Sequence, residues 1–154
     1  LYGRYTLSDL NNAYNFLSVN GKPITTTEER NDYLTDTNVL NFGDFLLPNI
    51  HPYWDGVVDA GDGANHVKDQ FMAIKALTNK SILIKETGYS TSGDVRVSEK
   101  LQKSFYAKLA KKNKVKFSYF EAFDQSWKDN LAVEPHWGLF KSDRTPKQVV
   151  SLFS

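Results

Sequence analysis

Polar side chains that can do chemistry gather where apolar, strand-like runs end. The run 82–84 leads into Glu86, and an earlier apolar run leads into Asn49, His51 and Tyr53. Because the carboxyl ends of parallel strands meet at one edge of a sheet, we expect these groups to lie close together. Carboxylates can act on a glycosidic bond as acid, base or nucleophile, while amides, imidazoles and aromatic rings bind sugars. The set favours a sugar site over a phosphate site, because no glycine-rich phosphate-binding loop opens a helix.

Two further segments add candidates of the same kinds. One strand ends in Thr27, Glu28 and Glu29, and the loop after the last strand carries Glu121, Asp124, Trp127, Lys128, Glu134, His136 and Trp137. Each candidate has a purely structural alternative. Glu86 can be a strand-end carboxylate that faces solvent with an ordinary pKa, and the loop indoles can serve packing alone. Glu121 is expected to brace the loop rather than to do chemistry.

The composition narrows the class of protein. The 154 residues are 40% hydrophobic and 24% charged, which is typical of one soluble globular domain. A net charge of +1 gives no reason to expect a nucleic-acid partner, and no apolar run reaches the length of a membrane span. There are no cysteines, and the three histidines lie far apart in the sequence. The segment 59–65 lacks the alternating acidic ligands of a calcium loop, so we predict no metal and no cofactor, and a turn or helix cap there.

Hydrophobic periodicity predicts alternating strands and helices. Strands are expected over 22–28, 44–54, 81–86 and 115–123. Helices are expected over 7–20, 64–80, 97–113 and 145–153, with 31–40 as a short helix or irregular turn. Such alternation implies a parallel sheet covered by helices. Four strands and about four helices amount to half of an eightfold βα barrel, and an open flavodoxin-like sheet is the ordinary alternative.

Three of these helices have an apolar face that should point inward. The inward residues are Leu10, Tyr14 and Leu17 in the first, Val67, Phe71, Ile74 and Leu77 in the second, and Val97, Leu101, Phe105 and Leu109 in the third. Ser8 is a candidate cap for the first helix, and Pro146 should lie near the first turn of the last.

Four motifs occur in a familiar order and spacing. They are NIHPYW at 49–54, KETGYST at 85–91, FEAFDQSWKD at 120–129 and VEPHWGLFKSDRTPK at 133–147. Together they resemble glycoside hydrolase family 17, the β-1,3-glucanase family, and more closely its bacterial and fungal members than its plant members. The resemblance covers about residues 22–147. It implies an α/β fold that is the C-terminal half, about strands five to eight, of a (β/α)8 TIM barrel, with residues 1–154 as a partial glycoside hydrolase domain.

The resemblance also implies a reaction. The family hydrolyses or transfers β-1,3-linked glucans with retention, and Glu86 matches its nucleophile at the end of strand seven. A retaining mechanism needs a second carboxyl group about 5 Å away as acid/base. In the family this residue is a Glu after Gly-Asn at the end of strand four, and residues 1–10 resemble the segment that follows it. We therefore expect a fragment of a retaining β-1,3-glucan hydrolase or transglycosylase that is inactive alone.

Further family positions imply substrate-binding residues. They are Glu28, Asn49, His51, Tyr53, Tyr89, Lys128, Glu134 and Trp137. His51 stands where plant members usually have Tyr, and Tyr89 replaces a usual Trp but keeps an aromatic ring for stacking. Gln125 stands where a Glu is usual, which puts the charge network around Lys128 in question.

The expected substrate or ligand is a β-glucan oligo- or polysaccharide. The missing N-terminal half-barrel or a second copy of the chain is the expected protein partner, because an open sheet needs covering. Two other functions stay open at this point: a non-catalytic glucan-binding module and a self-associating half-barrel. The family suggests secretion or the cell envelope, and the sequence distinguishes neither hydrolysis from transfer nor endo from exo action.

Overall fold

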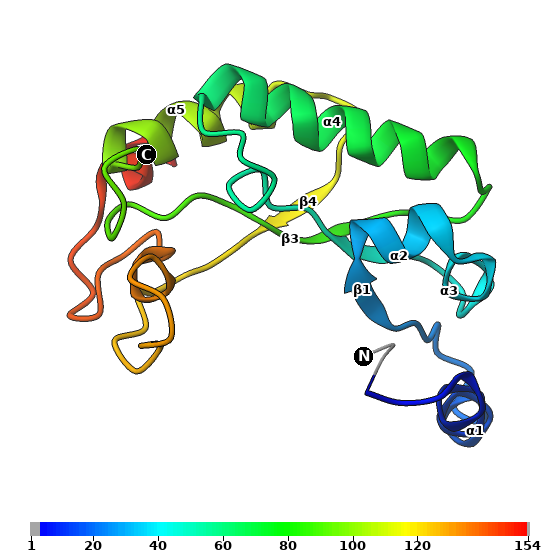
Figure 1. The fold of residues 1–154 in the computed structure, drawn as a ribbon. Coiled ribbons are helices and arrows are strands. Elements are labelled where there is room, and N and C mark those ends of the chain that lie inside the picture. The colour runs from blue at the N-terminus through cyan, green and yellow to red at the C-terminus, as the bar shows by residue number, and fades with distance from the viewer. Residues whose placement is uncertain (1–3, 154) are drawn as a thin grey trace.

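A computed structural model describes residues 4–153, so residues 1–3 and Ser154 of the predicted domain lie outside the described part. Short strands alternate with helices along the chain (Figure 1). The strands are β1 (Thr27–Glu29), β2 (Leu47–Asn49), β3 (Ile84–Thr87) and β4 (Phe117–Tyr119). The α-helices are α1 (Leu7–Ser18), α2 (Arg30–Thr35), α3 (Thr37–Asn41), α4 (Ala60–Ala76) and α5 (Glu99–Ala110). Two 3-10 helices follow, η1 (Glu134–His136) and η2 (Gln148–Leu152).

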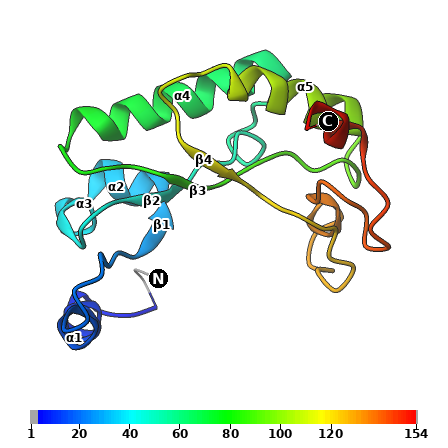
Figure 2. The same cartoon turned by 180° about the vertical axis from the view of Figure 1, so that it is seen from behind.

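The four strands form one parallel sheet in the order in which they occur in the chain, β1-β2-β3-β4. The register aligns Glu29 with Asn49 and Asn49 with Glu86. Helices α4 and α5 both cover one face of the sheet (Figures 1 and 2). A flavodoxin-like sheet would place the second strand outside the first and helices on both faces, so the order rules out that alternative. The predicted parallel α/β fold is confirmed.

The helix layer is built on the predicted apolar faces. Val67, Phe71 and Ile74 of α4 are buried, as are Phe105 and Leu109 of α5, and the two helices pack on each other over the sheet. The side chain of Asp59 accepts hydrogen bonds from the backbone N–H groups of Gly61 and Asp62, so the segment 59–65 is a helix cap and first turn, as predicted. Leu77, predicted to face inward, is instead 52% exposed, because α4 ends at Ala76.

Helix α1 departs from expectation in two ways. It begins with Thr6 and Asp9 in a capping box rather than with Ser8 as its cap. It has no buried residue, and Leu17, predicted to face inward, is 46% exposed. Figures 1 and 2 show α1 below β1, away from the layer of α4 and α5. Its main aromatic contact is the edge-on packing of Tyr14 on Phe42, with ring centroids 5.8 Å apart.

The strands and the last helix are shorter than the sequence patterns indicate. Pairing within each strand stops after three or four residues, and only isolated bridges such as Leu46 with Ile82 and Phe123 with Phe140 continue it. The predicted helix 145–153 is reduced to η2, because Pro146 instead bridges to Phe140 before the helix begins. None of the helices in residues 4–153 is long and apolar enough to cross a membrane.

Candidate active site

Glu86 stands near the carboxyl end of β3, with His51 from the loop after β2 beside it. Nε2 of His51 lies 3.7 Å from Oε2 of Glu86, and the ammonium group of Lys85 contacts Oε1. The His51 contact lowers the pKa of Glu86, burial opposes this, Lys85 lowers it further, and the result is a pKa of about 2. Glu86 is therefore ionised at neutral pH, which is the state a carboxylate nucleophile needs. The alternative of a strand-end carboxylate with an ordinary pKa is wrong.

Glu86 opens into a pocket of about 440 Å³. The other lining residues are Glu29, His51, Trp54, Phe120, Glu134 and Trp137. They come from the ends of all four strands and from the loop after β4. The predicted convergence of polar and aromatic groups at one sheet edge is thus confirmed, and we call this cavity the Glu86 pocket.

Two stacked indoles form one wall of the Glu86 pocket. The rings of Trp54 and Trp137 have centroids 5.9 Å apart and an interplanar angle of 29°. Trp137 is only 1% exposed and also meets the His51 ring edge-on at 5.2 Å, whereas Trp54 is 48% exposed. Trp137 therefore both packs the loop and lines the pocket, so the two interpretations of it are not exclusive. Trp127 is 73% exposed and is not among the lining residues.

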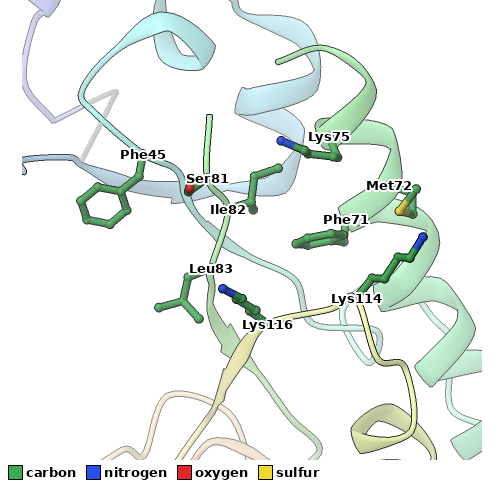
Figure 3. Close-up of a pocket in the computed structure, with 9 residues that line it drawn as sticks. All are labelled: Phe45, Phe71, Met72, Lys75, Ser81, Ile82, Leu83, Lys114 and Lys116. Atoms are coloured by element: carbon green, nitrogen blue, oxygen red, sulfur yellow. The ribbon is translucent and has the colours of Figure 1, made fainter. Parts of the chain in front are cut away.

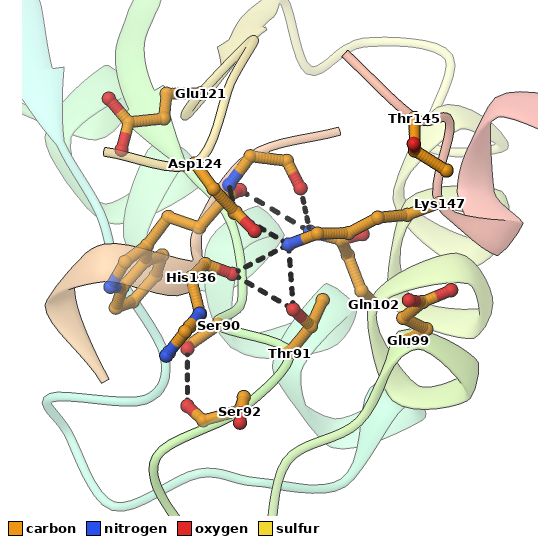
Figure 4. A network of polar contacts seen from close by, with 12 residues as sticks. Ser90, Thr91, Ser92, Glu99, Gln102, Glu121, Asp124, His136, Thr145 and Lys147 are labelled. Atoms are coloured by element: carbon orange, nitrogen blue, oxygen red, sulfur yellow. Dashed lines mark hydrogen bonds and ion pairs between the residues drawn. The ribbon is translucent and has the colours of Figure 1, made fainter. Parts of the chain in front are cut away.

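A buried ion pair fixes the loop that carries Glu134 and Trp137 (Figure 4). Nζ of Lys147 lies 2.6 Å from Oδ1 of Asp124, 2.7 Å from Oγ1 of Thr91 and 3.0 Å from the carbonyl oxygen of His136. The Lys147 side chain is 1% exposed, and burial lowers its pKa while Asp124 opposes that change. The pair ties the last loop to the chain just after β3.

Gln102 of α5 holds the same loop from the helix side. Its Nε2 donates to the carbonyl oxygens of Trp137 at 3.3 Å and Gly138 at 3.0 Å, and to that of Tyr89 at 3.2 Å. A Cβ on Gly138 would lie 2.2 Å from the backbone nitrogen of Asp124, so only glycine fits at this close approach. The indole of Trp137 is therefore positioned by backbone contacts rather than by its own N–H, which has no partner among the described residues.

The end of β1 corrects one predicted site residue. Glu28 is 3% exposed and accepts a hydrogen bond from Oγ1 of Thr26 at 2.7 Å, away from the Glu86 pocket. Successive side chains of a strand point to opposite faces, so its neighbour Glu29 reaches the pocket instead. Oε1 of Glu29 accepts from Nδ2 of Asn49 at 3.3 Å. The prediction placed Glu29 at the strand end but gave the role to Glu28. Alternation puts the two side chains on opposite faces, but the all-polar sequence of β1 does not show which of them faces the pocket.

Tyr89 is the second correction. It is 0% exposed, its hydroxyl donates to the carbonyl oxygen of Val57, and its ring packs edge-on against Phe105 at 4.7 Å. A Cβ on Gly63 of α4 would lie 2.4 Å from the Tyr89 hydroxyl oxygen, so this helix is shaped to admit the ring. Tyr89 is a core residue, and the prediction that its ring stacks on sugar is wrong.

Tyr53 and Lys128 are not among the residues that line the Glu86 pocket, but each contacts residues that do. The Tyr53 hydroxyl donates to Oδ2 of Asp94 at 2.8 Å, and its ring packs edge-on against Trp54 at 4.9 Å. Nζ of Lys128 lies 3.0 Å from Oε1 of Glu121 and 4.6 Å from the ring centroid of Phe120. Both side chains therefore brace pocket residues.

Glu121 behaves as the loop brace that its position suggested. Burial raises its pKa, and Lys128 opposes that rise. The side-chain amide of Gln125 also donates to Glu121. Lys128 thus forms an ion pair with Glu121, although Gln125 stands where the family usually has a Glu.

Another cavity, of about 530 Å³, lies before the amino ends of β3 and β4 (Figure 3). Its walls are mainly apolar, with Phe71, Ile82 and Leu83, and its charged residues are Lys75, Lys114 and Lys116. It contains no carboxylate, so it offers neither a nucleophile nor an acid for glycoside chemistry. Within residues 4–153, no three histidine, aspartate or glutamate side chains are grouped so that they could hold a metal ion.

The chain is similar to known glycoside hydrolases. Residues 6–138 match the BtgE/BtgC glycoside hydrolase domain. The chain is 28% identical over 124 residues to a glucan 1,3-beta-glucosidase of Schizosaccharomyces pombe, covering 71% of this chain and 38% of that protein. It is 30% identical over 132 residues to a glucan 1,3-beta-glucosidase of Arthroderma benhamiae, covering 67% of this chain and 41% of that protein.

A solved structure shares the fold. It is the glycoside hydrolase family 17 beta-1,3-glucanosyltransferase from Rhizomucor miehei, with a TM-score of 0.80 and 23% identity over 94% of this chain and 57% of that chain. An active-site mutant of that enzyme has been solved in complex with laminaritriose. The chain thus spans about two fifths of the length of these two glucosidases and about half that of the transferase. The match over 6–138 and the agreement of relatives and fold show that the chain belongs to glycoside hydrolase family 17.

Proposed function

We propose that this chain supplies the nucleophile half of a retaining β-1,3-glucan hydrolase or transglycosylase. The observation that carries the proposal is Glu86, held ionised at a strand end and opening into a pocket walled by indoles. In the reaction an oxygen of Glu86 attacks the anomeric carbon, and the bond from that carbon to the leaving sugar oxygen breaks. Its relatives are named as glucan 1,3-beta-glucosidases and a beta-1,3-glucanosyltransferase, which supports a glucan as substrate.

The acid/base carboxyl group belongs, in this proposal, to the other half of a (β/α)8 barrel. The strands follow one another in barrel order, the helices α4 and α5 cover one face, and β1 and β4 each pair on one side only among the described residues. The apolar side chains Phe16 and Val19 at the end of α1 are 79% and 83% exposed, as expected for a helix that another unit covers. Strands β1 to β4 would then be strands five to eight of the complete barrel.

An activated donor tests the nucleophile without needing the acid. In a 2-deoxy-2-fluoro-β-laminaribiosyl fluoride, attack by Glu86 expels fluoride with the electrons of the C–F bond, so no proton has to be delivered. We expect slow formation of a covalent glycosyl ester that peptide mass spectrometry locates at Glu86, absent in Glu86→Gln and retained in Glu121→Gln. Labelling at another residue, or equal labelling of Glu86→Gln, contradicts the assignment.

Polymeric glucan gives the complementary result. Because protonation of the leaving oxygen contributes about 10²- to 10⁴-fold, the chain alone should show little turnover of laminarin. A longer chain that carries the complete barrel should restore turnover, and Glu86→Gln should abolish it. If the complete barrel is inactive, or active without Glu86, the proposed enzyme function fails, and glucan binding or self-association of the half-barrel takes its place.

A further inference from the structure

The cavity of about 530 Å³ lies at the opposite end of the strands from the Glu86 pocket (Figure 3). Its wall is formed by the later part of α4 and by the segments that lead into β2, β3 and β4. We call it the amino-end cavity. None of the described residues that line it also lines the Glu86 pocket. A ligand bound here would leave the nucleophile accessible, so the amino-end cavity is separate from the proposed glucan site.

Large apolar side chains make up most of the wall of the amino-end cavity. Phe71 on α4 and Ile82 before β3 are buried and form its floor. Met72 and Leu83 are 45% and 39% exposed, so an apolar rim faces water. Ser81 is the only uncharged polar side chain among the described residues that line the cavity. The wall therefore suits an aliphatic chain and offers few hydrogen bonds to a sugar or a nucleobase.

Three lysines line the same cavity, while none of its described lining residues carries a carboxylate. They are Lys75 on α4, and Lys114 and Lys116 before β4. In Figure 3 the ring of Phe71 lies between Lys75 on one side and Lys114 and Lys116 on the other. None of the three forms an ion pair among the described residues. Lys75 donates to the carbonyl oxygen of Lys80 at 2.9 Å, but an ammonium group has three donors. The cavity thus combines an apolar wall with positive charge that no carboxylate of its own wall balances.

We propose that the amino-end cavity binds a single-chain amphiphile with an anionic head, namely a long-chain carboxylate. The proposal goes beyond the proposed function and does not rest on it. The aliphatic tail lies on Phe71 and covers the exposed parts of Met72 and Leu83, which removes apolar surface from water. The carboxylate head accepts charge-assisted hydrogen bonds from the ammonium groups of Lys114 and Lys116. A volume of about 530 Å³ is within the ordinary range of small-molecule sites.

The competing explanation gives the lysines a purely structural role. Long lysine side chains can cover apolar surface with their stems while their ammonium groups stay in water. Under this explanation the charge of a ligand's head group makes no difference to binding. Under the proposal an anionic head is favoured over a neutral one, and a cationic head is repelled. The two explanations therefore differ in how binding depends on the head group at constant tail length.

The single methionine of the chain gives a direct probe of the amino-end cavity. Met72 lines the cavity, so labelling the methionine methyl group with carbon-13 yields one NMR resonance on its wall. Titration at neutral pH with decanoate, kept below the concentration at which it forms micelles, should shift this resonance to saturation. A neutral decyl ether of penta(ethylene glycol) and the cation decyltrimethylammonium have the same tail, and both should bind at least about tenfold more weakly. Acetate, which lacks the tail, should leave the resonance unchanged.

Three variants separate the contributions of head and tail. The double variant Lys114→Gln/Lys116→Gln should weaken decanoate binding about tenfold and leave binding of the neutral ether unchanged. Leu83→Ser should weaken both ligands, because it removes apolar surface from the rim. The matched control is Lys22→Gln/Lys100→Gln, which removes the same charge at two exposed lysines that do not line the cavity and should change neither affinity.

Each other outcome overturns the proposal. If decanoate and the neutral ether bind equally tightly, or if the Lys114/Lys116 double variant binds decanoate as well as the control does, the lysines only cover apolar surface. If decanoate leaves the Met72 methyl resonance of the folded chain unchanged, the cavity is not an amphiphile site. If that resonance changes with protein concentration in the absence of ligand, a second copy of the chain fills the cavity instead. None of these outcomes bears on Glu86, because labelling by the activated donor tests the proposed function separately.

Discussion

Replacing His51 by phenylalanine should raise the pKa of Glu86. The pKa of Glu86 falls from an ordinary 4.5 to about 2, and the contact with His51 is the largest cause. One pKa unit corresponds to about 1.4 kcal/mol, so the whole environment favours the charged form by about 3 kcal/mol. Phenylalanine keeps the ring volume against Phe120 and Trp137 but cannot donate to the carboxylate. With the burial retained and the largest lowering contact gone, we expect the pKa of Glu86 to rise from about 2 towards its ordinary value.

A carbon-13 NMR titration of the glutamate side-chain carboxyls measures this directly. The sign also predicts a stability effect. Because the folded-state pKa of Glu86 is depressed, its contribution to the free energy of unfolding is present above pH 4.5 and is lost as the pH falls towards 2. In His51→Phe, the free energy of unfolding should therefore fall less as the pH drops from 4.5 towards 2. The matched control is His66→Phe, since His66 pairs with Asp55 and not with Glu86. A Glu86 pKa that stays near 2 in His51→Phe would show that Lys85 alone holds the charge and would refute the reasoning.

Three further substitutions test the framework behind the site. Lys147→Met leaves Asp124 buried without its cation and should cost about 3–5 kcal/mol in the free energy of unfolding, measured in urea. Tyr89→Phe loses one hydroxyl contact and should cost about 1 kcal/mol by the same measurement, with laminari-oligosaccharide binding unchanged. Gly88→Ala places a Cβ 2.2 Å from the carbonyl oxygen of Phe120, so a cost of about 1–3 kcal/mol and a lower thermal midpoint are expected. A neutral Lys147→Met, weakened binding in Tyr89→Phe, or an unchanged midpoint in Gly88→Ala would contradict the respective argument.

The features that could be predicted from sequence are those set by local periodicity and by shared topology. Helices α4 and α5 have clear apolar faces, so their positions and most inward residues followed from the pattern. Glu86 and His51 were expected together because strand ends of a parallel sheet converge, and the structure places them 3.7 Å apart.

The features that could not be predicted depend on contacts between distant segments. Thr27, Glu28 and Glu29 are all polar, so no apolar alternation shows which of them faces the pocket. The burial of Tyr89 depends on the missing side chain of Gly63, which lies on another element. The contacts of Asp55, next to Trp54, with Arg30 and His66 join three segments, and no sequence motif predicts them. The sequence therefore shows which residue types lie near the site, but the direction of each side chain depends on packing.

The balance of charge around the Glu86 pocket bears on the chemistry itself. Glycoside cleavage passes through an oxocarbenium-like transition state, in which positive charge develops at the anomeric carbon. Three carboxylate side chains, Glu29, Glu86 and Glu134, line the pocket, and no lysine or arginine among the described residues does. Fixed negative charge at this position favours the transition state more than the neutral bound sugar, because only the former carries positive charge. If these carboxylates act in this way, Glu134→Gln in the complete barrel should lower the rate of bond cleavage more than it weakens glucan binding, and an equal loss in both would assign Glu134 to binding alone.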